Sequence, residues 1–470
     1  MKTIAIIGGG AAGLAAAVAA AETVRDAGAG AGSDAEVRVT VYEASDRVGR
    51  SILATGNGRC NFSNAVIDAS RYRNAAFVEE TLGACEATFC EDGESAGAPA
   101  ADEPLSGVDA RAKALNAMSC ADAVGAWNVV LRFFSDRGLM WREEGEGRLY
   151  PLANKATSVL DCLRAACVAA GVRELVESEV AAVEAPRGEG DRFTLRLADR
   201  RLERADAVIA AVGGAAGERL LPAGVPFRAM APTLGPIATD PRWPRQLDNI
   251  RVRGALELWR PGEGMSLEAC RDAGFPPDEH LGERLVAREV GEVMFRKYGV
   301  SGIAAFNLSR LMEPGDRLAV DFVPGVRLVD MAAFLNRRRK MLFASLGRSV
   351  TWEDMLRGMV LAPVADVLLK AVGLRGGDET TKESAAKLAC VLKGLRLPVT
   401  GLGDERQCQV RRGGVDVAAI DAHTCEAREM PGLYVVGEAL DVDAPCGGYN
   451  LHWAWASGLL AGRSAVEALR

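Results

Sequence analysis

The sequence of 470 residues has few histidines and lacks the residue spacings that build metal and disulfide-exchange centres. Its three histidines, His280, His423 and His452, are far apart and lack ligand spacing, so we expect no zinc or non-haem iron site. None of the 11 cysteines belongs to a C-x-x-C pair. An odd number of cysteines, without a secretory signal or a short disulfide framework, favours reduced thiols in a cytoplasmic protein.

Long apolar runs and excess positive charge are also missing. The stretch 4–21 carries no charge, but it is mostly alanine and glycine, and its GGGAAG cluster would interrupt a signal or membrane helix. Lys and Arg number 56 against 63 Asp and Glu, a net charge of −7, opposite to that of a typical nucleic-acid binder. We therefore expect binding neither to a membrane nor to DNA. The basic run NRRRK at 336–340 is interpreted as a solvated helix face, with an RNA or anionic partner as the alternative.

Glycine is the residue in excess. The chain has 52 glycines, about 11% against the usual ~7%, without the Gly-X-Y period of collagen. The apolar fraction of 49% and the charged fraction of 25% are those of a globular protein with a large core. Glycine serves either flexible linkers or close approach of the backbone to another group, so the positions of the glycines decide between the two.

Several of these glycines form a turn near the start of the chain. The pattern Gly8-x-Gly10-x-x-Gly13 follows an apolar, β-branched run at 3–7 and precedes an alanine-rich helix at 14–25. A second expected strand, 37–42, ends in Glu43, whose carboxylate suits an adenosine ribose. Free N–H groups at the helix start favour a pyrophosphate. We therefore predict dinucleotide binding; the alternative is an ordinary glycine turn before an alanine-rich helix.

Two further polar, glycine-spaced segments have no core-building pattern. One is GRSILATGNGRCNFSN at 49–64, and the other is GEALDVDAPCGGYNL at 437–451, which leads into a helix. Backbone amides with Asn and Arg side chains suit a large polar ligand. A helix N-terminus directed at the N1/C2 carbonyl edge of a flavin would stabilise its anionic reduced form.

The pattern of apolar, polar and glycine residues changes along the chain in a way that predicts an interrupted α/β domain. Strand-like alternation, as in IRVRGALELW at 250–259, indicates an antiparallel, barrel-like element after about residue 218. A helical pattern occupies 327–394, and strand and glycine patterns return near 400. The acidic Ala/Gly/Pro-rich stretch 91–107 is interpreted as a mobile surface insertion.

Six stretches, taken together and in order, resemble the bacterial YhiN/BaiN-like flavoproteins, NAD(P)/FAD-dependent or aminoacetone-oxidase-like enzymes. They are GGGAAGLAAA, GRSILATGNGRCNFSN, EGRLYPLANKA, VMFRKYGVSG, RRGGVDVAAIDAHT and GLYVVGEALDVDAPCGGYNLHWAWASG. The resemblance implies an α/β fold in which a discontinuous Rossmann-type FAD-binding domain (1–217 and 395–470) is interrupted by a β-barrel-like insert (218–326) and a helical insert (327–394).

The resemblance also implies which residues hold FAD. Gly8, Gly10, Ala12 and Gly13 would hold the pyrophosphate, Glu43 the adenosine ribose, and the Val180 backbone the adenine. Around the flavin and diphosphate it implies Gly49, Arg50, Asn57, Gly58, Arg59, Cys60 and Asn61, with Val212, Gly213 and Gly214 as a second flavin turn. It further implies Gly437 and Glu438 at the ribityl phosphate, Asp441 supporting that turn, and Gly448, Tyr449, Asn450 and Leu451 facing the isoalloxazine.

The chain departs from the family pattern at two places. After Gly214, a Ser/Pro/Gly-rich segment of the family is missing, and the chain passes almost directly to APTLGPI at 231–237. The family motif F-T-H-x-G-x-S-G-P reads FRKYGVSGI at 295–303, so its Thr, His and Pro are lost. The candidates for acid or base catalysis are therefore Lys297, Tyr298 and Tyr449.

The expected function is FAD-dependent hydride transfer between flavin N5 and a small organic substrate. Enone or ketone reduction and amine or amino-ketone oxidation both remain open, with NAD(P)H as a transient reductant because only one complete dinucleotide motif is present. The alternative is an FAD-binding protein without turnover, regulatory or related to RNA modification. A dehydrogenase that uses NAD alone would leave the TGNGRCN and GGYNL segments unexplained.

Overall fold

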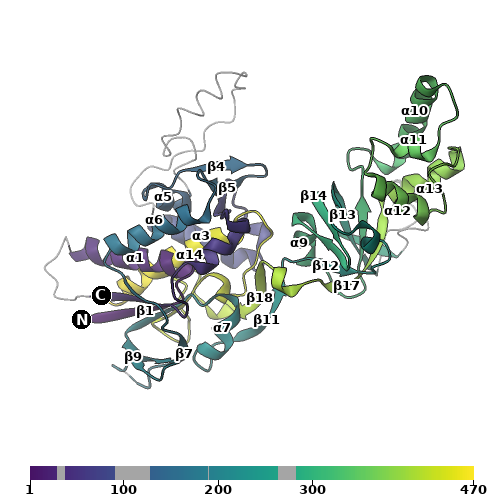
Figure 1. Ribbon diagram of the computed structural model, residues 1–470. Coiled ribbons are helices and arrows are strands. Elements are labelled where there is room, and N and C mark those ends of the chain that lie inside the picture. The colour runs from purple at the N-terminus through teal and green to yellow at the C-terminus, as the bar shows by residue number, and fades with distance from the viewer. Residues whose placement is uncertain (29–36, 90–127, 189, 263–281) are drawn as a thin grey trace. The chain divides into compact units, whose positions relative to one another are not determined.

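The computed structural model describes residues 1–28, 37–89, 128–188, 190–262 and 282–470, so the expected insertion at 91–107 lies outside it. These residues form two compact units, one made of 1–231 with 410–470 and the other of 232–409. Figure 1 shows the elements of each unit. Among the helices described, none has the length and apolar character needed to cross a membrane.

The first unit is built on a five-stranded parallel sheet in the order β19-β10-β1-β2-β6. Its strands are β1 (Lys2–Ile7), β2 (Val37–Tyr42), β6 (Arg173–Leu175), β10 (Ala207–Ala210) and β19 (Leu433–Val435). β1, β10 and β19 are buried runs of apolar residues, as expected for strands covered on both faces. The sequence prediction of a parallel α/β sheet is therefore confirmed.

Two long helices, α1 (Ala11–Gly28) and α14 (Tyr449–Ala468), pack directly on one another although they come from opposite ends of the chain (Figure 1). Glycines make this approach possible. A Cβ on Gly458 would lie 2.3 Å from the carbonyl oxygen of Ala12, and one on Gly462 would lie 2.3 Å from that of Ala16. Small residues on both helices therefore fix the start of α1 beside α14.

Shorter elements complete this unit. The small sheets are β3 (Ser63–Asn64) with β5 (Arg148–Pro151) and β4 (Trp141–Glu144); β7 (Val180–Glu184) with β8 (Phe193–Leu197) and β9 (Leu202–Ala205); and β11 (Phe227–Thr233) with β18 (Val410–Val415). The remaining helices are α2 (Arg50–Ala54), α3 (Ala75–Phe89), α5 (Val129–Ser135), α6 (Ala156–Ala169) and α7 (Gly213–Leu220), with 3-10 turns η1 (Thr55–Gly58), η2 (Ala69–Arg71), η5 (Val417–Ala419) and η6 (Gly437–Ala439).

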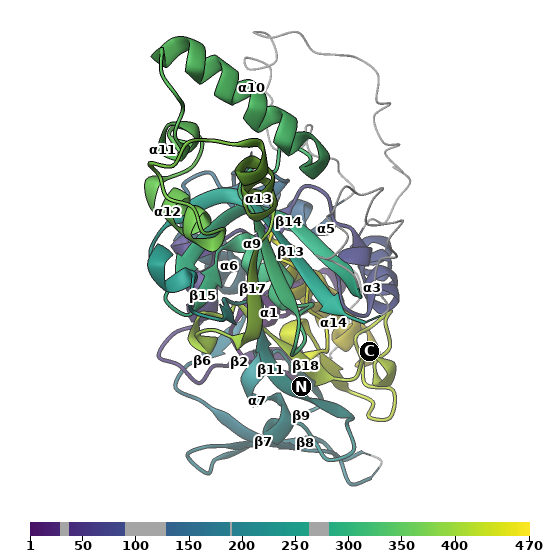
Figure 2. The same cartoon turned by 90° about the vertical axis from the view of Figure 1, so that its right-hand side faces the viewer.

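The second unit contains a closed six-stranded barrel in the order β12-β15-β14-β13-β16-β17. Figure 2 labels β13, β14, β15 and β17 of this barrel. Its strands are β12 (Ile237–Thr239), β13 (Arg251–Pro261), β14 (Glu283–Arg296), β15 (Gly299–Ser301), β16 (Arg317–Asp321) and β17 (Leu395–Leu402). Helix α9 (Ile303–Ser309) contacts β14, and the 3-10 turns η3 (Pro244–Leu247) and η4 (Glu405–Gln407) lie outside the strands. The alternation seen in the sequence predicted this barrel, and the structure confirms it.

Four helices form the rest of the second unit. They are α10 (Leu328–Leu346), α11 (Trp352–Leu356), α12 (Ala362–Ala371) and α13 (Lys382–Lys393). The N-cap of α13 is Thr381, whose hydroxyl oxygen accepts a hydrogen bond from Ser384 N at 3.1 Å. Strand 395–402, assigned from sequence to the FAD domain, pairs with β12 and β16 and so lies in the barrel.

Candidate functional site

The glycine turn brings β1, α1 and β10 into very close contact. Gly8 has a φ of 100°, and a Cβ there would lie 2.4 Å from the carbonyl oxygen of Ala211. A Cβ on Gly13 would lie 1.9 Å from the oxygen of Gly8. At Gly10 the same addition would meet only Ser51 Oγ, at 3.2 Å. The backbone at Gly10 is therefore accessible beside the N-terminus of α1, where unpaired N–H groups attract phosphate.

Glu43, at the end of β2, holds this turn through two backbone amides. Its carboxylate accepts hydrogen bonds from Gly9 N at 2.9 Å and Ser45 N at 2.8 Å. The carbonyl oxygen of Glu43 accepts from Ser178 N at 2.8 Å, which brings the segment before Val180 against the same strand end. The glycine turn, Glu43 and the start of β7 therefore meet at one edge of the sheet.

The loop that follows α2 has an unusual backbone. Gly56, Asn57, Gly58 and Cys60 all have φ between 55° and 81°, a left-handed region that glycine and asparagine tolerate best. Because burial raises the pKa of the Cys60 thiol to about 12, this cysteine is not a thiolate nucleophile. A Cβ on Gly49, before α2, would lie 2.2 Å from Leu160 Cδ1, so the loop also packs closely on α6.

Arg59 is tied to the neighbouring β4–β5 hairpin. Its guanidinium forms an ion pair with Glu144, donates to Asn154 Oδ1 and lies 4.2 Å from the centre of the Tyr150 ring. Arg50, by contrast, is exposed and makes only a 3.8 Å ion pair with Asp46. The two arginines of the 49–64 segment therefore differ: Arg59 fixes the loop, and Arg50, on the first turn of α2, is available to a ligand.

The N-terminus of α14 lies beside Asn61 and Ser63. A Cβ on Gly448 would lie 2.1 Å from Ser63 O and 3.0 Å from Asn61 Oδ1. The Asn61 Oδ1 atom is buried and has no hydrogen-bond partner among the described residues. The Asn450 side chain accepts a hydrogen bond from Ala444 N and donates one to Ala444 O, so it closes the loop between these two residues. A polar atom without a partner beside a glycine-cleared helix start fits a bound polar group.

The turn from Val212 to Gly214 meets the segment that begins at Gly437. Val212 is the N-cap of α7, and a Cβ on Gly214 would lie 3.1 Å from Glu438 Oε1. The same oxygen accepts a hydrogen bond from Arg411 N at 2.6 Å. Burial raises the pKa of Glu438 above its usual range. A Cβ added to Gly437 would lie 3.0 Å from Ala12 Cβ on α1.

Two buried aspartates fix the conformation after Glu438. Asp441 accepts from Arg73 Nε at 2.8 Å and from Gly413 N at 3.1 Å. Asp443, fully buried, receives two bonds of 3.0 Å from the Arg412 guanidinium. Sequence analysis named Asp441 but missed its arginine partners. The only signal was the alternation of Asp with apolar residues in ALDVDA, which does not show what an aspartate binds.

A buried Ser63–His452 pair was also missed. His452 Nδ1 lies 2.9 Å from Ser63 Oγ, and burial lowers the pKa of His452 to about 3, so the ring is neutral near pH 7. The histidine lies one turn into α14, on its buried side. An isolated histidine in an apolar helix gave no pattern from which its serine partner could be predicted.

The three candidates for acid or base catalysis fall in different units. Tyr449, in the first, is buried, its carbonyl accepts a 2.9 Å bond from Tyr72 Oη, and burial raises its pKa. Lys297 and Tyr298 lie in the second unit, on the β14–β15 turn. Lys297 is exposed and 4.0 Å from Asp248, whereas the Tyr298 hydroxyl is buried without a hydrogen-bond partner among the described residues. Neither unit by itself brings all three together.

Leu451, half-buried in α14, packs against the main apolar core of the first unit, and Ala12 lies buried in α1. In the described part of the chain, no group of three or more His, Cys, Asp or Glu side chains has the arrangement of a metal site.

Comparison with known proteins places this geometry in a family. The model of the HI0933-like protein Rossmann domain matches residues 112–464. A 3-dehydro-bile acid delta(4,6)-reductase of Clostridium scindens is 30% identical over 99% of this chain and 100% of its own. Ribosomal RNA dihydrouridine synthases of Escherichia coli (25%, 98% of both chains) and Haemophilus influenzae (24%, 96% of this chain and 95% of that one) are also similar. The resemblance drawn from the motifs is confirmed: the chain belongs to the HI0933-like family of YhiN/BaiN-like flavoprotein oxidoreductases.

Proposed function

We propose that this protein binds FAD and uses it to reduce a carbon–carbon double bond conjugated to a carbonyl group. The observation that carries the proposal is a pair of helix starts cleared by glycine within one unit: α1, behind Gly8, Gly10 and Gly13, and α14, behind Gly448. Gly10 leaves the backbone at the start of α1 open apart from Ser51 Oγ, whereas Gly448 lets the start of α14 pack against the carbonyl oxygen of Ser63. Such ends favour phosphate and other electron-rich groups.

The residues between these helix starts fit the parts of FAD. Gly10 and the α1 N-terminus would hold the diphosphate, and Glu43, with both oxygens already on backbone amides, would exchange one of them for a ribose hydroxyl. Val180 would meet the adenine. Arg50, the 56–61 loop, the Gly213–Gly214 turn and Glu438 would line the ribityl chain and the flavin.

The names of the relatives support the choice of reaction. A delta(4,6)-reductase of a 3-dehydro-bile acid and a dihydrouridine synthase both add two hydrogens to a carbon–carbon double bond. Bound FAD, in its reduced form, would supply the hydride. NAD(P)H, bound transiently on the substrate side, would reduce the flavin again. Amine or amino-ketone oxidation, the other reaction considered from the sequence, has no counterpart among these three names.

The chain's own residues would handle charge and protons. The N-terminus of α14, at Gly448, stabilises negative charge near the flavin. Asn61 Oδ1, buried and without a partner, accepts a hydrogen bond from the bound group. The ordinary pKa of a tyrosine, about 10, already keeps Tyr449 and Tyr298 protonated at neutral pH, and burial raises the pKa of both further, so either hydroxyl would be a proton donor if substrate reached it. Lys297 is the third candidate, and its exposure leaves it free to contact substrate.

The experiment is purification followed by an absorbance spectrum and anaerobic titration with NADH and NADPH. We expect flavin absorbance with one FAD per chain, and bleaching by at least one of the two nucleotides that is reversed by an enone. A colourless protein that fails to take up added FAD would refute the proposal. FAD bound in full, but with no oxidation or reduction of any enone, carbonyl or amine, would favour the alternative of a flavoprotein without turnover.

A further inference from the structure

The segment 61–64 lies across the start of α14 and is fastened to it at both of its ends. Asn64 Nδ2 donates a hydrogen bond of 2.9 Å to the carbonyl oxygen of Gly447, the residue before the N-cap of the helix. Trp455 Nε1, further along α14, donates one of 2.9 Å to the carbonyl oxygen of Phe62. The segment and the first turns of the helix therefore keep a fixed position relative to each other.

Between these two contacts lies a third, made by two side chains. Ser63 Oγ and His452 Nδ1 are 2.9 Å apart, and both residues are buried. Burial lowers the pKa of His452 to about 3, so the ring is uncharged near neutral pH and shares the hydrogen bond without leaving a charge in the core. Two apolar side chains would fill the same space without the cost of burying polar groups. A satisfied polar pair in a core instead holds its two segments in one arrangement.

The position of this segment matters because it touches the N-cap of α14. A Cβ on Gly448 would lie 2.1 Å from the carbonyl oxygen of Ser63, so the two backbones are in close contact. The same Cβ would lie 3.0 Å from Asn61 Oδ1, the buried oxygen that has no hydrogen-bond partner among the described residues. A shift of Ser63 would therefore move both Asn61 and the helix start.

We propose that Ser63 and His452 are positioning residues that set the reduction potential of the bound flavin. They hold the segment 61–64 on α14 and so fix where the N-terminus of the helix acts on the cofactor. Negative charge grows on a flavin as it is reduced, and a helix N-terminus stabilises that charge only within its first turn. A displaced helix start would therefore weaken the binding of reduced FAD more than that of oxidised FAD. The inference rests on the proposed function, because it requires FAD at this end of α14.

The test is a spectroscopic titration of the FAD-loaded, full-length protein against a redox dye of known potential. His452→Leu and Ser63→Ala should each weaken the binding of reduced FAD about tenfold relative to oxidised FAD, which lowers the potential of a two-electron couple by about 30 mV. The double variant Ser63→Ala/His452→Leu should lower the potential no further than either single variant, because all three lack the same contact.

A conservative variant tests whether the hydrogen bond itself is responsible. His452→Asn keeps a side-chain donor and acceptor near the place of the histidine Nδ1, so it is able to bond to Ser63 Oγ whichever of the two groups donates. Its potential should lie close to that of the wild type. The thermal unfolding midpoint of each variant is measured beside its potential, so that a loss of stability is distinguished from a change at the flavin.

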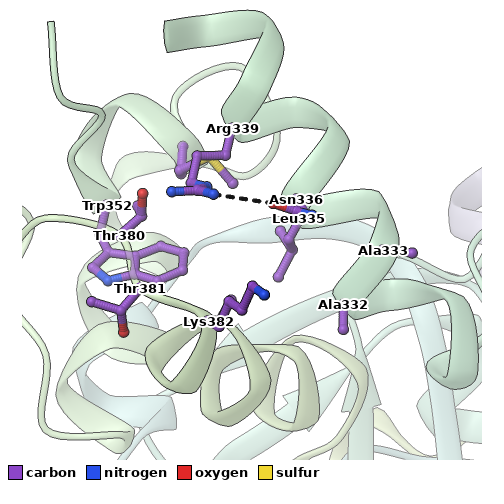
Figure 3. Close-up of a pocket in the computed structure, with 11 residues that line it drawn as sticks. Ala332, Ala333, Leu335, Asn336, Arg339, Trp352, Thr380, Thr381 and Lys382 are labelled. Carbon is purple, nitrogen blue, oxygen red and sulfur yellow. Dashed lines mark hydrogen bonds between the residues drawn. The ribbon is translucent and has the colours of Figure 1, made fainter.

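Two controls remove side-chain hydrogen bonds elsewhere. Thr81 is buried on α3, which packs on α14, and its Oγ1 donates to Phe77 O at 2.8 Å. Thr81→Val removes this buried hydroxyl and should lower the unfolding midpoint but not the potential. In the other unit, Arg339 donates to Asn336 Oδ1 at 3.3 Å beside the groove between α10, α11 and the start of α13 (Figure 3). Asn336→Ala should also leave the potential unchanged.

The outcomes keep this inference separate from the proposed function. A wild type that takes up no FAD would refute both. A yellow wild type whose potential is the same in Ser63→Ala, and in His452→Leu if that variant folds, would refute the positioning role alone. The role is also overturned if His452→Asn lowers the potential as much as His452→Leu, or if Thr81→Val lowers it as much as Ser63→Ala, because either result would assign the change to general loosening of the core.

Discussion

The charged side chains near the candidate site of the first unit differ from those on α10 of the second. In the unit of 1–231 and 410–470, the carboxylates near the candidate site are buried and held in place, with Asp443 on Arg412 and Asp441 on Arg73. On α10 of the other unit, Arg337 and Lys340 are exposed, with no partner in the described residues. Buried pairs fix a backbone, whereas exposed charges without partners contribute little to folding and are available to a ligand. The comparison separates a part of the molecule shaped around a cofactor from one suited to a partner.

The largest effect expected is that of removing a buried partner in the first unit. Arg412→Leu removes the two hydrogen bonds that the Arg412 guanidinium donates to the buried Asp443 carboxylate, which should lower the free energy of unfolding by about 3–5 kcal/mol. Thermal and urea unfolding would measure it. The control, Arg196→Leu, breaks the exposed pair with Glu184 and should cost about 0–1 kcal/mol. Equal losses in the two variants would show that burial does not distinguish these pairs.

The second effect concerns pH. His452 has a pKa of about 3 in the folded protein against 6.5 in the unfolded chain, so the unfolded chain binds the extra proton between these values. Its contribution to stability is complete above pH 6.5 and is lost as the pH falls toward 3, by about 1.4 kcal/mol per pH unit between these values. His452→Gln should remove this dependence from a series of urea unfolding curves. The exposed His423→Gln is the control and should reproduce the wild-type profile.

A third variant tests the space beside α1. Gly10→Ala adds a methyl group that meets only Ser51 Oγ, at 3.2 Å, so the fold should survive while approach of the diphosphate is obstructed. We expect about tenfold weaker FAD binding, or about 1.4 kcal/mol, in a fluorescence titration. Gly377→Ala, where a Cβ would have no neighbour within 4 Å, should bind FAD normally. Unchanged affinity in Gly10→Ala would remove this position from the cofactor site.

The smallest effect is expected at an exposed pair in the second unit. Lys387 lies 2.8 Å from Glu383, one turn away on α13. Lys387→Ala should lower the free energy of unfolding by about 0.3–0.5 kcal/mol at low salt, and the difference should vanish at 1 M salt. Urea unfolding at the two salt concentrations would measure it. A loss above 1 kcal/mol that persists in high salt would mean that this lysine has a structural role like that of Arg412.

Sequence analysis predicted most of the fold because the fold depends on local patterns. The β-branched run before Gly8, the glycine spacing up to Gly13 and the alternation at 250–259 each specify an element within a few residues. Boundaries that depend on tertiary pairing were not predicted. Strand 395–402 follows a helical segment and precedes a glycine-rich one, and only its pairing with β12 and β16 places it in the barrel.

The residues of the candidate site also divide into those that local sequence patterns predict and those that depend on tertiary contacts. Gly8, Gly10, Gly13 and Glu43 were identified because a dinucleotide-binding turn has a fixed local spacing. Arg73 and Arg412, the partners of Asp441 and Asp443, were not, because nothing in a sequence says which arginine will meet which aspartate, whether the two are 368 residues apart or 31.

The sequence by itself determined that a glycine turn would open a helix beside an acidic strand end, and that a barrel and helices would interrupt this domain. Only the tertiary structure decided that Asn61 Oδ1 would lie unpaired beside Gly448, that His452 would face Ser63, and that Arg338 would be anchored while Arg337 and Lys340 remained exposed. The physical reason is the sequence separation over which each kind of interaction acts. Turns and periodicity are set by neighbours a few residues away, whereas burial and charge pairing depend on which distant segments pack together.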